Sequence, residues 1–244
     1  RFEGIMNELE YISLTPTPTA LRPLLGLTIL VVEDSRYACD AMRLLCLRSG
    51  ARIRRADCLR SARRHLQVYR PSAVIIDLGL PDGSGAELIH ELANADQRIP
   101  AILGVSGDDM NEAVSLAAGA DGFLSKPLAA LAEFQTSILQ AIPEEMRPSG
   151  LRTITDEVVD PDPLAYRDDM AHASEMLSGF ADLKTLQYVA QFLQGVAKSA
   201  KDEQLGRAAG KLVYAGAEGN TVHSHHARLA GLVRERMFAQ ESVI

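Results

Sequence analysis

The sequence has few of the residues that mark secreted or membrane proteins. It has no tryptophan and three cysteines, Cys39, Cys46 and Cys58, an odd and sparse set that fits reduced thiols in a cytoplasm rather than a disulfide framework. No apolar stretch reaches the length of about eighteen residues that a membrane helix needs. Residues 1–14 include acids and no apolar block, so we expect no secretory signal. The expected location is cytoplasmic, without a membrane partner.

Positive charge is also scarce. The net charge is −7 and the isoelectric point is about 5.4, whereas nucleic-acid binding requires a basic surface. DNA is therefore not the expected partner. The hydrophobic share of 47% is typical of a globular protein with a core, and 244 residues suffice for two domains.

From Thr28 onward, short apolar runs alternate with amphipathic stretches. Strands are predicted at Thr28–Val32, around Ile53, and at Ala73–Asp77, Ala101–Ser106 and Gly122–Leu124. Helices are predicted at 36–48, 59–69, 85–93, 109–118 and 128–141. Strands rich in Val, Ile and Leu that alternate with helices indicate a parallel sheet covered on both faces. The expected fold is a doubly wound, five-stranded α/β domain, which binds ligands at the carboxyl ends of its strands.

Beyond this α/β part, prolines and glycines punctuate a polar segment, and helical periodicity follows it. Asp182, Asp202 and Asn220 stand where helix N-caps are expected. Four helices with short connections predict an antiparallel bundle. The predicted division is an extended lead-in at 1–25, an α/β domain at 26–142, a linker at 143–163 and a helical domain at 164–240.

Four predicted strands are followed by polar residues that a buried strand does not need. The first ends in Glu33-Asp34, the third in Asp77 and the fourth in Ser106, while Lys126 follows the fifth. Parallel topology brings these ends to one edge of the sheet. Carboxylates that crowd together favour a hard divalent cation with oxygen ligands, and Mg²⁺ can also take phosphoryl oxygens.

These residues resemble the receiver domain of two-component response regulators, and the loop Leu78–Gly85 is similar to the family's loop after the phosphoacceptor. The resemblance covers about residues 27–142. It implies that Asp77 is the nucleophile that becomes an aspartyl phosphate. Asp34 then binds Mg²⁺ directly, Glu33 holds the ion through water, and the carbonyl of Gly79 is a further ligand.

The same resemblance assigns the remaining site residues. Lys126 pairs with phosphoryl oxygens, Ser106 hydrogen-bonds the attached group, and Phe123 occupies the aromatic switch position. Gly79 leaves its position without a side chain, which opens the phosphoryl group to water. The implied partner is a sensor histidine kinase or a phosphotransfer protein. The domain would not be a conventional enzyme, because it accepts and hydrolyses its own phosphoryl group.

The helical domain is predicted to deliver the output by binding protein. Tyr188 and Phe192 lie off the regular apolar stripe of its second helix, and we predict a homodimer interface there. An alternative is a DNA-binding regulator, because Thr221-Val222, His225 and Leu229 resemble part of a recognition helix.

A second alternative is a phosphorelay intermediate, because four helices suit a histidine phosphotransfer domain. That domain needs an exposed helical histidine followed closely by a lysine and a glycine. His172 and His226 both lack this context, so a degenerate bundle of similar shape is the preferred interpretation.

Overall fold

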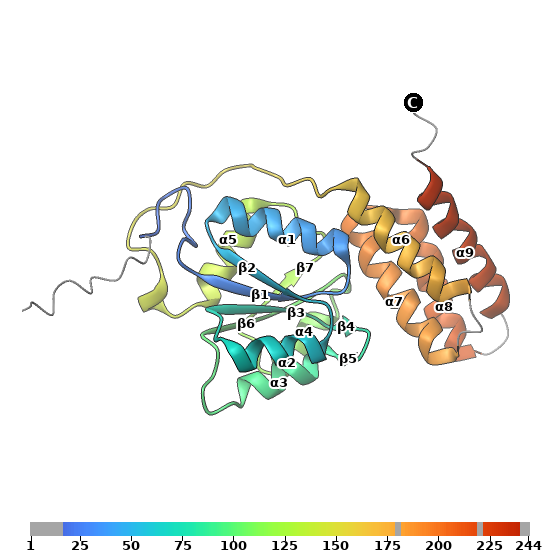
Figure 1. Ribbon diagram of the computed structural model, residues 1–244, viewed down its shortest axis with the longest axis horizontal. Coiled ribbons are helices and arrows are strands. Elements are labelled where there is room, and N and C mark those ends of the chain that lie inside the picture. Colours follow the sequence, from blue (N-terminus) through green and yellow to red (C-terminus); the bar gives the residue numbers. More distant parts are fainter. Residues whose placement is uncertain (1–16, 179–181, 219–221, 240–244) are drawn as a thin grey trace, which may run out of the picture.

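The computed structural model describes residues 17–178, 182–218 and 222–239, which form an α/β part followed by a helical part (Figure 1). Five parallel strands make one sheet in the order β2-β1-β3-β6-β7. Their bounds are β1 Thr28–Val32, β2 Arg52–Ala56, β3 Ala73–Asp77, β6 Ala101–Ser106 and β7 Gly122–Ser125. A short antiparallel pair, β4 (Gly79–Leu80) and β5 (Gly83–Ser84), follows β3. The predicted doubly wound sheet is confirmed.

Helices cover both faces of the sheet (Figure 1). α1 (Arg36–Ser49) and α5 (Leu131–Ala141) lie on one face, and α2 (Leu59–Val68), α3 (Gly85–Ala93) and α4 (Asn111–Ala117) lie on the other. α5 begins three residues later than predicted. The reason is that Ala130 forms a β-bridge with Val158, so the residues just before α5 pair with a distant extended segment instead of starting the helix.

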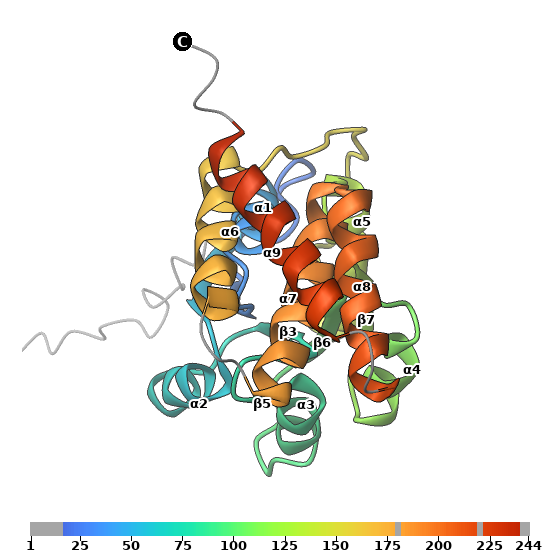
Figure 2. The same ribbon diagram turned by 90° about the vertical axis from the view of Figure 1, so that its right-hand side faces the viewer.

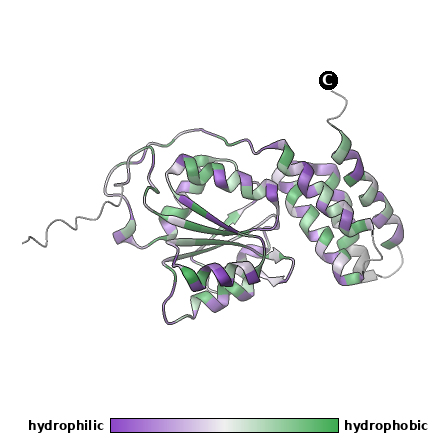
Figure 3. Ribbon diagram, in the orientation of Figure 1, coloured by the Kyte–Doolittle hydropathy of each residue, from purple (hydrophilic) through white to green (hydrophobic). Residues whose placement is uncertain are grey.

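The core lies on both sides of β3, all five residues of which are buried. Met42 and Phe134 fill the space under α1 and α5, while Leu88 and Ile89 of α3 fill the opposite side. Each such side chain stabilises the fold by roughly 1.5–3 kcal/mol when fully buried. The apolar colouring of the central strands in Figure 3 shows the same layer.

Four helices form the carboxy-terminal bundle, as predicted (Figure 2). They are α6 Pro163–Ser178, α7 Leu183–Ala200, α8 Glu203–Glu218 and α9 Val222–Phe238. Two predicted N-caps are confirmed: Asp182 accepts a hydrogen bond from the Thr185 amide at 2.8 Å, and Asp202 accepts one from the Leu205 amide at 3.0 Å. The predicted cap Asn220 lies outside the described residues. None of the described helices is long and apolar enough to cross a membrane.

The bundle packs against the carboxyl end of the sheet (Figure 1). α6 and α7 contact α1, and α7 also contacts β4, which begins two residues after Asp77. The segment that joins the two parts runs along the α/β part: the Arg152 guanidinium donates to Thr136 Oγ1 at 2.7 Å, and Val159 is buried in the core. Leu24, within the predicted lead-in, is fully buried as well. The predicted domain boundaries stay a prediction.

Candidate functional site

Three carboxylates meet at the carboxyl edge of the sheet. β1 and β3 pair in parallel with Val32 opposite Ile76, so the residues that follow Val32 lie next to Asp77. Ligand atoms of Glu33, Asp34 and Asp77 all lie within 4.8 Å of one another. The sequence had predicted this grouping, because strands that run in parallel end at one edge.

Lys126 is the cation of this site. Its side chain is buried, with Nζ 2.7 Å from Glu33 Oε2 and 3.2 Å from Asp77 Oδ2. The residue follows β7 and precedes Pro127 through a cis peptide bond. One buried ammonium group therefore faces three carboxylates, and the site retains an excess of negative charge.

Burial and that excess of negative charge both shift the pKa values of the site. Burial, together with the charge of Asp77, raises the pKa of Glu33 well above its usual value and raises the pKa of Asp34 to about 7. Burial by itself lowers the pKa of Lys126, but Asp77 and Glu33 outweigh this effect and the pKa is raised. Lys126 is therefore held as a cation. Its single positive charge is too little to keep the pKa values of Glu33 and Asp34 at their usual levels.

The donor set fits a hard divalent cation. Carboxylate and carbonyl oxygens are the ligands that Mg²⁺ prefers, and a second positive charge would relieve the repulsion among the acids. Gly79 follows Asp77 by two residues and lines the same cleft. Among the described residues, this is the one cluster of three or more His, Cys, Asp or Glu residues with a metal-binding arrangement.

Because Asp34 must lose its proton to bind a cation, Mg²⁺ binding is expected to depend on pH. With a pKa of about 7 in the metal-free fold, Asp34 holds a proton below that pH, and the ion must displace it. Mg²⁺ stabilises the folded state by mass action. The rise in Tm caused by Mg²⁺ should therefore shrink as the pH falls from about 8 to about 6. Thermal unfolding with and without Mg²⁺ measures this, and equal shifts at both pH values would contradict the assignment.

Ser106 lies beside the acidic site, and Phe123 lies on the neighbouring strand β7. Ser106 Oγ accepts hydrogen bonds from the amide of Asp108 at 3.2 Å and from Asn111 Nδ2 at 2.9 Å, so it contacts the loop before α4 and the start of that helix. It lines the same cleft as Asp77. Phe123, on β7, is half-buried and packs beside Gly104 of β6. Ser106 therefore connects the site to the region of α4.

The bundle contributes a residue that sequence reasoning did not place in the site. The Tyr188 hydroxyl of α7 donates a hydrogen bond to Asp34 Oδ2, with 2.7 Å between the two oxygens. Burial and the neighbouring Asp34 raise the pKa of Tyr188, so its hydroxyl stays protonated as the donor. The signal available in the sequence was that Tyr188 lies off the apolar stripe of its helix; nothing local indicated a partner 154 residues away.

A second contact joins α6 to the start of α1. Asp169 is buried and accepts hydrogen bonds from Ser35 Oγ at 2.7 Å, the Arg36 amide at 2.8 Å and the Tyr37 amide at 3.1 Å. Amides at a helix N-terminus lack intrahelical partners and favour an anion. The carboxylate of Asp169 therefore completes the cap of α1, and it does so next to the acidic site.

The prediction that Tyr188 and Phe192 form an exposed interface for a second chain is wrong for both side chains. Phe192 is buried in the bundle core, where it meets the ring of His172 edge-on. Tyr188 faces Asp34 of the same chain. The apolar face of α7 is wider than its regular stripe, because the helix is buried on two sides. Homodimer formation itself stays a prediction.

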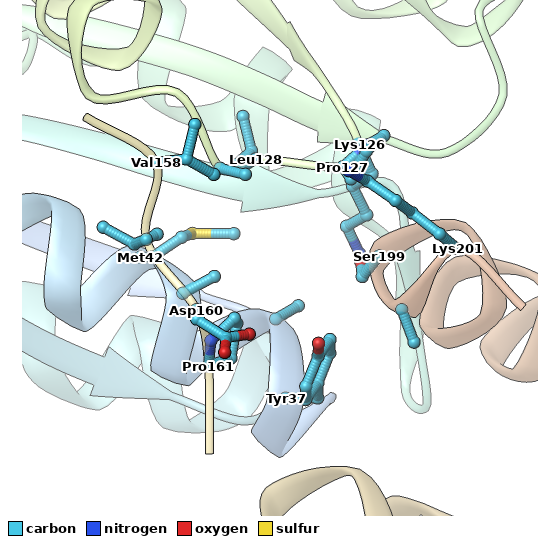
Figure 4. A pocket seen from close by; sticks show the side chains of 15 residues that line it. Tyr37, Met42, Lys126, Pro127, Leu128, Val158, Asp160, Pro161, Ser199 and Lys201 are labelled. Carbon is cyan, nitrogen blue, oxygen red and sulfur yellow. The ribbon is translucent and has the colours of Figure 1, made fainter. Parts of the chain in front are cut away.

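α7 closes over the acidic site and leaves a cleft of about 1160 Å³. The cleft is lined by Asp34, Asp77 and Lys126 from the α/β part and by Gln191 and Gly195 from α7, among other residues. A smaller cavity of about 310 Å³ lies beside Lys126-Pro127, where Tyr37 of α1, Asp160 of the joining segment and Lys201 after α7 converge (Figure 4). Both spaces lie at the junction of the two parts.

The fold and this geometry define a doubly wound α/β domain with an acidic, lysine-containing site at its sheet edge. Residues 29–138 match the family described as the response regulator receiver domain. This stretch of the chain is a receiver domain of two-component systems, as the sequence predicted. The match ends before α6 and so does not cover the helical bundle.

Curated relatives match about half of the chain. It is 31% identical to the KDP operon transcriptional regulatory protein KdpE of Escherichia coli, over 47% of this chain and 50% of that one. It is also 31% identical to the virulence transcriptional regulatory protein PhoP of Salmonella typhimurium, over 41% of this chain and 45% of that one. The chain spans about half the length of these relatives.

Solved structures of receiver domains are similar as well. One is the receiver domain of a signal transduction histidine kinase from Syntrophus aciditrophicus, with 26% identity, a TM-score of 0.42, and coverage of 46% of this chain and 86% of that one. Another is the receiver domain of a Pseudomonas aeruginosa sensor histidine kinase, described with magnesium in its active-site cleft. It shows 24% identity, a TM-score of 0.43, and coverage of 47% of this chain and 96% of that one.

Proposed function

We propose that this chain is a response regulator in which Asp77 accepts a phosphoryl group and the helical bundle carries the output. The observation that supports this most strongly is the buried contact of Lys126 with Asp77 and Glu33 beside Asp34. Phosphoryl transfer depends mainly on positioning and on neutralising spreading charge. A carboxylate nucleophile next to a fixed cation and a metal-binding acid pair meets both needs.

Each residue of the site has a role in the proposed transfer. A carboxylate oxygen of Asp77 attacks the phosphorus of the donor, and the bond between phosphorus and the donor atom breaks. Lys126 neutralises charge on the phosphoryl oxygens. Ser106, released from its contacts with the α4 region, donates a hydrogen bond to the attached group. The domain acts on itself only, so it is no conventional enzyme.

Mg²⁺ would be held by Asp34 and Asp77 directly, by Glu33 through water, and by the Gly79 carbonyl. When bound, it supplies positive charge to the phosphoryl oxygens and lowers the repulsion between these acids. The tight Glu33–Lys126 contact supports an indirect role for Glu33, since one of its oxygens is already engaged.

The output would follow from the position of α7. A phosphoryl group on Asp77 adds about −1.5 to −2 charge at pH 7, directly under a helix whose Tyr188 already contacts Asp34. Movement of Ser106 and Phe123 would change the surface around α4, and loosening of α7 would expose bundle surface to a partner protein. A homodimer through the bundle is one such complex. The phosphoryl donor would be a sensor histidine kinase or a phosphotransfer protein, and the proposed setting is the cytoplasm.

Labelling with a small radioactive phosphodonor tests the proposal. The full chain should be labelled when Mg²⁺ is present, and a chelator should prevent labelling. Asp34→Asn removes a direct metal ligand and one charge, so at limiting Mg²⁺ its labelling rate should fall by about tenfold or more, as lost metal-dependent charge stabilisation of a few kcal/mol predicts. Undiminished, Mg²⁺-dependent labelling of this variant would contradict the metal assignment.

A DNA-binding output is the second candidate, because both curated relatives are named as transcriptional regulators. The comparisons give no support to the expectation that DNA is excluded as a partner. The family match nonetheless covers residues 29–138, in the receiver half, and acids outnumber bases from residue 151 to the end. A gel-shift assay with and without phosphodonor separates a protein-binding output from a DNA-binding one.

A phosphorelay role for the bundle has less support. His172 packs edge-on against Phe192, and the His226 ring nitrogen Nε2 lies 3.1 Å from the carbonyl oxygen of Leu177. Neither histidine lines the cleft that holds Asp77. Phosphohistidine in the bundle, which acid destroys, would revive this alternative.

A further inference from the structure

The face of α7 above the phosphoacceptor carries one amide side chain that the proposed function does not use. Tyr188, Gln191 and Gly195 are spaced by three and four residues, so they lie on one face of the helix. Tyr188 contacts Asp34 at one end of this row. At the other end, the position of a Cβ on Gly195 lies 3.6 Å from Lys126 Nζ. Gln191 is therefore placed between the metal-binding acids and the lysine.

Lys126 Nζ itself lies 3.2 Å from Asp77 Oδ2, so the row crosses the cleft above the phosphoacceptor. Gln191 and Asp77 line this same cleft. The glutamine side chain is exposed to the cleft and makes no hydrogen bond with any residue in the described part of the chain. Its amide is therefore available to solvent or to a phosphoryl oxygen.

Gln194 is a less suitable candidate, although it also lines the cleft. Its Nε2 lies 3.0 Å from the Cβ position of Gly210 on α8, so its side chain extends toward the neighbouring helix. The two glutamines thus have different surroundings.

The cleft also has room for water. The Cβ position of Gly79, two residues after Asp77, has no atom within 4 Å. A residue with a side chain there would shield the phosphoryl group from this side. The cleft of about 1160 Å³ is far larger than one water molecule needs.

We propose that α7 promotes hydrolysis of the aspartyl phosphate in its own chain, with Gln191 positioning the attacking water. This inference rests on the proposed phosphorylation of Asp77. A glutamine amide can accept a hydrogen bond from water and donate one to a phosphoryl oxygen. In phosphoryl transfer a glutamine can orient the attacking water, and such positioning is a main part of catalysis. The bundle would then set the lifetime of the signal.

The step is a simple hydrolysis. The water oxygen attacks phosphorus, and the bond between phosphorus and the Asp77 oxygen breaks, with its electron pair returning to the carboxylate. The two protons of the water leave with the product, which is dihydrogen phosphate before it equilibrates with solvent. Gln191 is unchanged, so it is a positioning residue that acts through the water.

The test measures the lifetime of the phosphoryl group on the full chain. Protein labelled with radioactive acetyl phosphate is freed of donor, and the bound label is followed over time. Gln191→Ala and Gln191→Leu should both lengthen the half-life by about threefold to tenfold, the effect of losing one hydrogen bond in the transition state. The rate of labelling and the affinity for Mg²⁺ should stay close to those of the wild type.

Gln187→Ala is the matched control, because Gln187 is exposed on the same helix and does not line the cleft. It should decay like the wild type. Unchanged or shortened half-lives for both Gln191 variants would overturn the inference. So would a wild-type half-life in Gln191→Leu alone, since leucine restores bulk without the amide. A wild type that takes no label refutes the proposed function itself. This outcome is distinct from a change in decay, which can be measured only on labelled protein.

Discussion

A chain that carries Asp77→Asn is expected to take up no phosphoryl group from a small phosphodonor, under conditions that label the wild type fully. An amide of the same shape fills the same space, but its oxygen is a poor nucleophile and carries no charge. Asp77 is 8% exposed and lies 3.2 Å from Lys126. The loss should be complete rather than partial, because the proposed attack is made by the Asp77 carboxylate itself.

The variant should also remain folded, which separates loss of chemistry from loss of structure. The charge of Asp77 raises the pKa of both Asp34 and Glu33, so its removal relieves repulsion in the metal-free site. We expect a metal-free Tm equal to or above that of the wild type. Asp96→Asn, which changes an exposed carboxylate in a loop, is the control and should label normally. Labelling of Asp77→Asn at the wild-type rate would remove Asp77 from the mechanism.

Asp169→Ala is expected to separate the bundle from the receiver domain. The buried carboxylate accepts three hydrogen bonds at the start of α1, and a hydrogen bond to a charged group contributes roughly 1.5–3 kcal/mol. Loss of that interaction shifts the equilibrium between docked and undocked bundle by about tenfold to a hundredfold. The radius of gyration from X-ray scattering should rise, and amide exchange should increase at Ser35 to Tyr37.

Asp168→Ala is the matched control for this experiment. Asp168 is the neighbouring acid, and its ion pair with Arg36 at 2.6 Å is exposed on both sides. Exposed ion pairs contribute about 0–1 kcal/mol, so this variant should keep the wild-type radius and exchange. If the two variants behave alike, then Asp169 does not hold the bundle in place.

The sequence determined the receiver half in almost every element. Its central strands β1, β3 and β6 are apolar runs that only a sheet covered on both faces can bury. Two of its helices begin at side-chain caps, α1 at Ser35 and α3 at Ser84. The grouping of Glu33, Asp34 and Asp77 also follows from the sequence, because parallel strands place their carboxyl ends at one edge. Lys126 could be assigned to the same site, because it follows the last strand and therefore lies at the carboxyl edge of the sheet.

The bundle was predictable as four helices for the same reason: the periodicity of its apolar residues and the caps at Asp182 and Asp202 are local signals. The wrong prediction concerned the faces of α7. Periodicity reports that a residue such as Phe192 lies off the regular stripe, but it does not report how many neighbours bury the helix. Phe192 is in the core because α7 is covered on more than one side.

Only the tertiary structure decided where the bundle sits. The hydrogen bond from Tyr188 to Asp34 joins residues 154 positions apart, and that from Ser35 to Asp169 joins residues 134 apart. Docking of two folded parts depends on a few individual contacts between surfaces, and these contacts have no period and no spacing along the chain. A sequence pattern therefore identifies the phosphoacceptor site and the helices, whereas the placement of α7 over that site comes from the shape and charge of surfaces that exist only after both parts have folded.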